Sequence, residues 1–160
     1  MIRVFVTGGT FDKDYDEIGG TLTFGDTHLP EMLRLGRCEV DVSVRTLMMV
    51  DSMAMTADDR AVIVRNCLTC EESQIVVTHG TDTMVETAAA IAAGVPGKTI
   101  VLTGAMVPYA FGSCDGLFNL GSALSFAQTL PPGVYIAMNG RCFKWDRVRK
   151  NRETGMFEAT

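Results

Sequence analysis

Three apolar stretches of this chain stop on threonine and glycine, and this repetition limits the possible folds more than any other feature. The stretches are VFVTGGT at 4–10, IVVTHGT at 75–81 and IVLTGAM at 100–106. Short β-branched runs that end in a glycine-rich loop are typical of buried parallel strands. In open α/β sheets, ligands bind at the carboxyl ends of such strands. The first two copies share a further threonine, at Thr10 and Thr81, where the third has Met106. The alternative is that threonine and glycine merely end each strand.

Strand patterns alternate with helix patterns along the rest of the chain. Further strands are expected at 40–50 and 134–138, and the segment after Met138 is expected to be irregular. Helices are expected at 29–35, from Thr56, from Thr83 to Gly94, and at 117–130. The second and third of these begin with Thr56 and Asp59, and with Thr83 and Glu86, which predict capping boxes. This alternation predicts a three-layer α/β fold with right-handed crossovers.

The five main strands fit a mostly parallel, flavodoxin-like sheet of order 2-1-3-4-5, with helices on both faces. In that order the first and third strands are neighbours. The loops at 8–10 and 79–83 would then border one crevice. The sequence therefore predicts that Thr10 and Thr81 reach the same small ligand.

A polar insert at 12–27 follows the first of these loops. It carries Gly19-Gly20 between short β-prone runs, which predicts a hairpin. Such a hairpin is either a lid that excludes water from a site or an edge element that extends the sheet.

Length and charge narrow the class of protein. A chain of 160 residues fits one domain, 1–160. The net charge of −5 argues against a nucleic-acid partner, and no apolar run reaches the ~18 residues of a membrane span. Because the chain starts directly in a strand, with no leader pattern, we expect a cytoplasmic location.

Metals, disulfides and nucleotide cofactors are not expected. The odd number of cysteines, five, argues against a disulfide framework, and the Cys67/Cys70 pair lacks a second pair for zinc, so both are expected to be inert. The chain contains neither a GxxxxGK[ST] loop nor a GxGxxG that opens a helix after the first strand.

The two threonine loops carry residue types suited to acyl chemistry. A threonine hydroxyl attacks a carbonyl only when a base or a charge stabiliser assists it. Gly8 and Gly9 let bare backbone N–H groups approach a reacting atom. Asp82 could hold a ligand ammonium or a lysine, or it could cap the following helix. Donors for an anion beside a carboxylate suit an amino acid. We expect His79 to fix its loop by hydrogen bonds. The cations of 144–152 belong either to a surface turn or to an anion-binding or catalytic pocket.

Five further blocks of the chain form a specific set: TGGTF at 7–11, DSMAMT at 51–56, THGTDTMVETA at 78–88, TGAMVPYAFGSCDGLFNLGSA at 103–123 and MNGRCFKWDRVRKNRET at 138–154. In this order they resemble bacterial-type L-asparaginases. The resemblance implies hydrolysis of asparagine to aspartate and ammonia through an acyl-enzyme, without cofactor or metal, in a homo-oligomer that is at least a dimer. It covers only the catalytic first domain of the family, since the second domain is absent from these 160 residues.

The resemblance also implies roles for single residues. Thr10 matches the nucleophile, and Thr81, Asp82 and Lys150 match a second catalytic cluster. Ser52 matches the residue that binds the substrate α-carboxylate, and Asp82 also meets the α-amino group. The carbonyl of Ala105 would hold the scissile amide, and Gly80 and Met53 would border the substrate.

Two departures and one open question accompany this assignment. Tyr15 is the only candidate for the family's lid tyrosine, although a direct count along the sequence reaches Thr23. Met53 replaces a polar residue and so removes a hydrogen-bonding side chain. Pairing with Asp82 would keep Lys150 charged, whereas burial and the neighbouring cations Lys144, Arg147 and Arg149 would oppose the charge.

Three functions remain open on the sequence. They are hydrolysis of asparagine, with glutamine possible; hydrolysis of another, larger amide; and binding of an amino acid without turnover, as in a sensor module.

Overall fold

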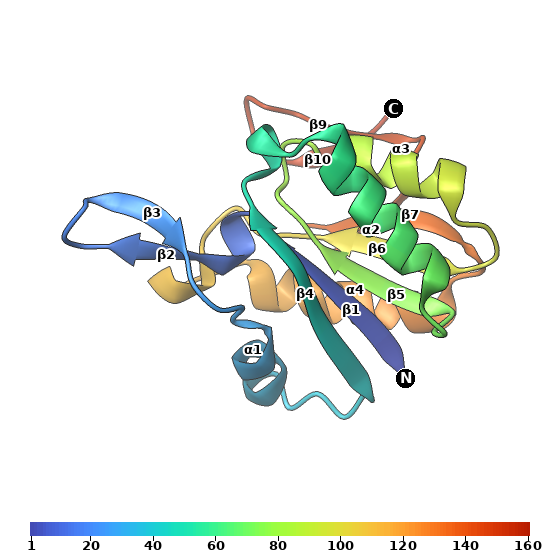
Figure 1. The fold of residues 1–160 in the computed structure, drawn as a ribbon, viewed down its shortest axis with the longest axis horizontal. Helices are drawn as coiled ribbons and strands as arrows, with labels where there is room; N and C mark the ends of the chain where they lie inside the picture. The colour runs from blue at the N-terminus through green and yellow to red at the C-terminus, as the bar shows by residue number, and fades with distance from the viewer.

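The computed structural model describes residues 1–160 and contains a six-stranded sheet with helices on both faces (Figure 1). The strand order is β4 (Val42–Val50), β1 (Ile2–Gly8), β5 (Gln74–Thr78), β6 (Thr99–Thr103), β7 (Gly133–Met138) and β8 (Arg141–Lys144). The first five strands are parallel, which confirms the α/β fold and the order 2-1-3-4-5. β8 adds an antiparallel edge beside β7.

Two helices cover each face of the sheet. α2 (Ala57–Thr69) and α3 (Met84–Gly94) pack on one face, and α1 (Leu29–Leu35) and α4 (Gly116–Thr129) pack on the other. Alternate residues of β1 supply the two cores, with Phe5 toward α2 and α3, and Val4 and Val6 toward α1 and α4. The central strands are therefore buried on both sides, as their continuous apolar runs predict.

One of the two predicted capping boxes forms. Thr56 Oγ1 accepts from the backbone N–H of Asp59, and the Asp59 side chain accepts from that of Thr56. The prediction of a capping box at Thr83 and Glu86 was wrong, because both side chains bind other partners. Thr83 Oγ1 donates to Ser52 O at 2.9 Å, and Glu86 pairs with Arg60 at 3.1 Å.

The segment after Met138 is more regular than the sequence suggested. Besides β8, it forms the antiparallel pair β9 (Val148–Lys150) and β10 (Phe157–Ala159). Val148 and Phe157 are buried in the core under α2 and α3, which fixes this pair in place. The expectation of an irregular tail was therefore wrong. The expected strand at 40–50 begins later, at Val42, and the last helix covers 116–129 rather than 117–130.

The insert after β1 forms the predicted hairpin. A short 3-10 helix, η1 (Thr10–Asp12), leads into β2 (Lys13–Asp16) and β3 (Thr21–Phe24), which pair antiparallel. Figure 1 shows this hairpin projecting away from the main sheet, and it forms a sheet of its own. The alternative in which it extends the main sheet was therefore wrong.

Three contacts tie the ends of the insert together. The buried Asp12 Oδ1 accepts from Thr27 Oγ1 at 2.9 Å and from the backbone N–H of His28 at 3.0 Å. The His28 ring lies 3.0 Å from Asp14 Oδ1. The base of the hairpin is thus held by its own residues.

None of the four α-helices has the length and apolar character needed to cross a membrane. All five cysteines are free, and burial raises the pKa of Cys67 to about 12, so this thiol stays protonated. No three His, Cys, Asp or Glu side chains are arranged to hold a metal ion.

Candidate active site

The carboxyl ends of β1 and β5 bring the two threonine loops together. Gly8 and Gly9 have φ of +92° and +80°, a backbone region that favours glycine. Gly9 N donates to Val50 O at 3.1 Å, and Gly9 packs directly against the backbone of Gly80. Thr10 and Thr81 follow these two glycines. Thr10 is half-buried, and its hydroxyl makes no hydrogen bond within the chain.

Thr81, Asp82 and Lys150 form a hydrogen-bonded cluster. Lys150 Nζ donates to Thr81 Oγ1 at 2.8 Å and to Asp82 Oδ1 at 2.7 Å. The Lys150 side chain is only 11% exposed and that of Asp82 is 40% exposed, so the carboxylate is the more solvent-accessible partner. Asp82 therefore binds a lysine, and the alternative in which it caps α3 was wrong.

The cluster sets the direction of the Thr81 hydroxyl. Because the ammonium donates to Oγ1, that oxygen acts as an acceptor, and its own proton can point to Met106 Sδ at 3.5 Å. In this arrangement the lysine donates to the Thr81 oxygen and does not accept its proton.

Ser52 lies beside the same loops, at the carboxyl end of β4. It begins the 3-10 helix η2 (Ser52–Ala54), is 2% exposed and packs against Gly80, where an added Cβ would lie 2.5 Å from Ser52 Oγ. Asp51 Oδ1 accepts from Met53 N at 3.0 Å, and the hydrogen bond from Lys13 lowers the pKa of Asp51. Met53 is 63% exposed.

The loop that carries Ala105 is held by Asp115 and Asn119, which belong to a DG-x-x-N motif at 115–119 within the block at 103–123. Asp115 accepts from the backbone N–H groups of Met106 and Val107, each at 3.0 Å. The buried Asn119 donates to Gly104 O at 2.9 Å and accepts from Asn139 N at 3.1 Å. Ala105 itself is buried. The motif marked this segment in the sequence, but only the structure identifies Asp115 and Asn119 as the residues that shape the loop.

His79 fixes its own loop, as predicted. Its Nδ1 lies 2.7 Å from Gly80 O, and its Nε2 lies 2.8 Å from Thr87 Oγ1. Burial lowers the pKa of His79 to about 4, so the ring is neutral, with Nδ1–H donating to the carbonyl. Its ring nitrogens contact neither Thr10 nor Thr81.

The two candidates for a lid residue lie apart from the cluster. Tyr15 is 54% exposed on β2 and pairs with Leu22, and Thr23 is exposed on β3. No hydrogen bond joins either side chain to the other candidate residues. Of the cations at 144–152, Lys150 enters the cluster, whereas Arg149 pairs with Glu158 at 2.8 Å.

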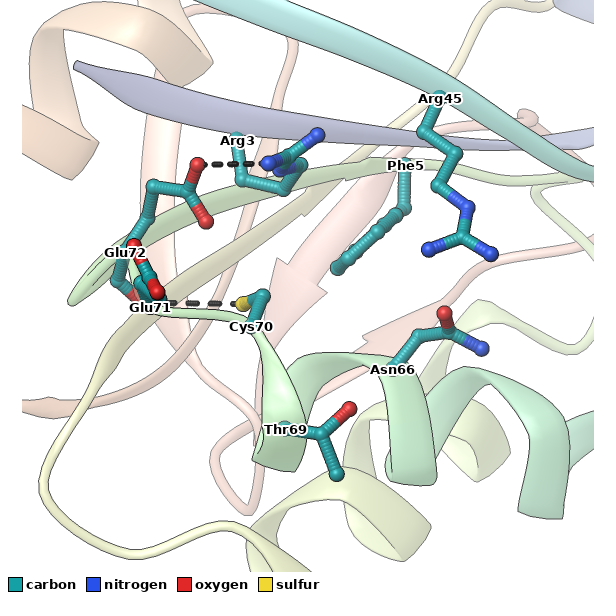
Figure 2. Close-up of a pocket in the computed structure, with 8 residues that line it drawn as sticks. All are labelled: Arg3, Phe5, Arg45, Asn66, Thr69, Cys70, Glu71 and Glu72. Atoms are coloured by element: carbon teal, nitrogen blue, oxygen red, sulfur yellow. Dashed lines mark hydrogen bonds and ion pairs between the residues drawn. The ribbon is translucent and has the colours of Figure 1, made fainter.

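A separate cavity of about 220 Å³ lies toward the amino ends of the strands (Figure 2). It is lined by Arg3, Arg45 and Glu72, among others, and Arg3 pairs with Glu72 at 2.7 Å. None of the candidate catalytic residues borders it. The candidate site is therefore defined by the contacts at the opposite end of the sheet.

Comparison with known proteins fits this geometry. The family model "Asparaginase, N-terminal" matches residues 1–159. The chain is 30% identical to the L-asparaginase of Thermococcus kodakarensis, over 97% of this chain and 49% of the relative, and 31% identical to L-asparaginase 1 of Escherichia coli, over 99% and 49%.

Solved structures agree. The thermostable L-asparaginase from Thermococcus kodakarensis superimposes with a TM-score of 0.85 at 30% identity, over 99% of this chain and 50% of that one. A probable cytoplasmic L-asparaginase from Campylobacter jejuni superimposes with a TM-score of 0.84 at 27% identity, over 99% of this chain and 52% of that chain. The chain spans about half the length of these relatives. With the family model matched over nearly its whole length, the chain belongs to the asparaginase N-terminal domain family.

Proposed function

We propose that this protein hydrolyses L-asparagine to L-aspartate and ammonia, with glutamine as an alternative substrate. The observation that carries the proposal is the Lys150–Thr81–Asp82 cluster beside the Gly9–Thr10 loop. A threonine hydroxyl without a hydrogen bond, on a loop packed against the loop of a lysine-paired threonine and carboxylate, is an arrangement suited to acyl transfer.

In the proposed reaction, Thr10 Oγ attacks the side-chain amide carbon. The hydroxyl proton passes to the leaving nitrogen, the C–N bond breaks and ammonia departs, which leaves an ester on Thr10. Water then attacks the ester, so that aspartate forms and the hydroxyl is restored. Lys150 and Thr81 would stabilise charge during these steps, in line with the donor direction of the cluster.

The substrate would be held by groups around the two loops. Ser52 would bind the α-carboxylate, Asp82 the α-amino group and the carbonyl of Ala105 the amide, while Gly80 and Met53 border the substrate. The half-exposed carboxylate of Asp82 is accessible to an ammonium group. Tyr15 would act from the hairpin, serving as a lid residue when the hairpin closes.

Further proposals concern the whole molecule. We propose that 1–160 form a single domain, that the protein acts in the cytoplasm and that it needs no metal or cofactor. We also propose that it forms at least a dimer, as the resemblance to the family implies. A molecular mass near the 17.3 kDa of one chain in light scattering would contradict the dimer.

Ammonia release from asparagine and glutamine is the direct test. Thr10→Ala should lower the rate about 10³-fold or more, since it removes the attacking oxygen. No release by folded protein at millimolar substrate would overturn the proposal. A strong preference for another amide would indicate the second function, and calorimetric binding of aspartate without any turnover would indicate the sensor module.

A further inference from the structure

Lys13 and Asp51 form an ion pair between the two segments that carry Thr10 and Ser52. Lys13 is the first residue of β2 and directly follows η1, which begins at Thr10. Asp51 directly precedes Ser52. Lys13 Nζ lies 2.5 Å from Asp51 Oδ2, and the lysine side chain is only 18% exposed. The two residues are 38 positions apart in the sequence, so the pair is not part of a local motif.

The Asp51 carboxylate also shapes the turn at Ser52. While Oδ2 faces Lys13, Oδ1 accepts from Met53 N, so one carboxylate holds the backbone on the far side of Ser52. In the same peptide unit, Ser52 O accepts from Thr83 Oγ1 at the start of α3. The turn is thus fixed to the core through Thr83 and to the hairpin through Asp51.

Lys13 contacts both strands of the hairpin. It belongs to β2, and its Nζ lies 5.9 Å from the centre of the Phe24 ring on β3. The base of the hairpin has its own ties, from Asp12 to Thr27 and from Asp14 to His28. Loss of the Lys13 charge would therefore leave the hairpin formed but uncouple it from the Ser52 turn.

We propose that Lys13 is a positioning residue that couples the placement of the β2–β3 hairpin to the orientation of Ser52 for a ligand carboxylate. This inference rests on the proposed function for the role of Ser52. It assigns Lys13 an effect on ligand affinity, with acyl transfer at Thr10 unaffected.

Two measurements on the same variants test the inference. Lys13→Met should weaken aspartate binding in calorimetry and raise KM for asparagine, each about tenfold, with kcat within about twofold of wild type. Lys13→Arg should restore most of the affinity, since it keeps a donor cation. Asp51→Asn should weaken binding similarly, and the double variant Lys13→Met/Asp51→Asn should add little more.

Glu72→Gln is the matched control. It breaks the Arg3–Glu72 pair, which joins β1 to the loop before β5 at the other end of the sheet (Figure 2). This variant should lose stability but bind aspartate like wild type. Equal weakening in Lys13→Met and Glu72→Gln would show a general loss of stability and overturn the inference.

Amide hydrogen exchange supplies a readout that needs no ligand. Met53 N donates to Asp51 Oδ1, and Ala54 N donates to Asp51 O, so both amides report on the turn. Their exchange should accelerate about tenfold in Lys13→Met and stay unchanged in Glu72→Gln. Unchanged exchange in Lys13→Met would overturn the coupling.

The outcomes separate this inference from the proposed function. Aspartate binding that depends on Lys13, without any ammonia release, would support the inference and reject the hydrolase. Ammonia release with the same KM in Lys13→Met would support the hydrolase and reject the inference. A wild-type chain that binds neither asparagine nor aspartate would overturn the proposed function and the ligand role of Lys13 together.

Discussion

Gly9 and Gly80 lie backbone against backbone where β1 and β5 end, and no side chain fits between them. This contact brings the Thr10 and Thr81 loops together. Because Gly9 also has a φ of +80°, a side chain there would be strained as well as crowded.

We expect Gly9→Ala to lower the free energy of unfolding by about 2–5 kcal/mol, as the sum of backbone strain and overpacking. Urea unfolding measures this. Gly97→Ala is the matched control, since Gly97 has a φ of +75° but open space around it, and it should cost only about 1–2 kcal/mol. Equal costs at the two positions would show that the Gly80 contact is unimportant.

Lys150→Met tests the cluster. The substitution keeps most of the side-chain volume but removes the ammonium that contacts Thr81 and Asp82. We expect kcat for ammonia release to fall about 10²–10³-fold. Arg149→Met, which breaks only the contact with Glu158 on the outer side of β9, should leave kcat within about twofold. A similar loss in both variants would contradict a specific role for Lys150.

The parallel order of the main sheet was predictable because its strands are buried on both faces. Ile75, Val76 and Val77 alternate between the two cores, so every residue of this run must be apolar. The change to polar and glycine residues at Thr78 and Gly80 marks the end of the strand. The pairing of β9 with β10 was not predictable. Val148 and Phe157 are isolated apolar residues in a charged segment. Their burial in the core stabilises these strands, and the sequence pattern alone does not indicate it.

The site shows the same division between local and distant contacts. The Thr56 capping box is local and was predicted, whereas the Thr83 hydroxyl was assigned to a helix cap and instead bonds Ser52, 31 residues away. The Lys150–Asp82 pair was expected from family resemblance alone, because no spacing rule connects residues 68 positions apart.

Asn119 offers a test of the Ala105 loop. Its buried amide satisfies Gly104 O and Asn139 N, so Asn119→Ala leaves both groups without this partner. We expect the free energy of unfolding to fall by about 2–4 kcal/mol. Asn66→Ala is a suitable control, because Asn66 bonds only a carbonyl of its own helix, and it should cost less than about 1 kcal/mol. Urea unfolding of both variants decides this, and a cost at Asn119 no larger than at Asn66 would contradict the network.

His79 predicts how stability depends on pH. Burial lowers its pKa in the folded chain to about 4, from an ordinary value of 6.5. Below pH 6.5 the unfolded chain takes up a proton that the folded chain does not. This group's contribution to the free energy of unfolding therefore falls between pH 6.5 and about 4, by roughly 3 kcal/mol in all.

Asp12 acts in the opposite direction, since burial raises the pKa of its carboxyl, and its unfavourable contribution disappears as pH falls through the folded-state pKa. The comparison of wild type with His79→Gln isolates the histidine. In urea unfolding between pH 7 and pH 4, the variant should lose less stability than wild type as pH falls. NMR titration of the wild-type protein measures the pKa of the His79 ring independently. A ring that titrates near pH 6.5 would contradict a neutral, loop-fixing histidine.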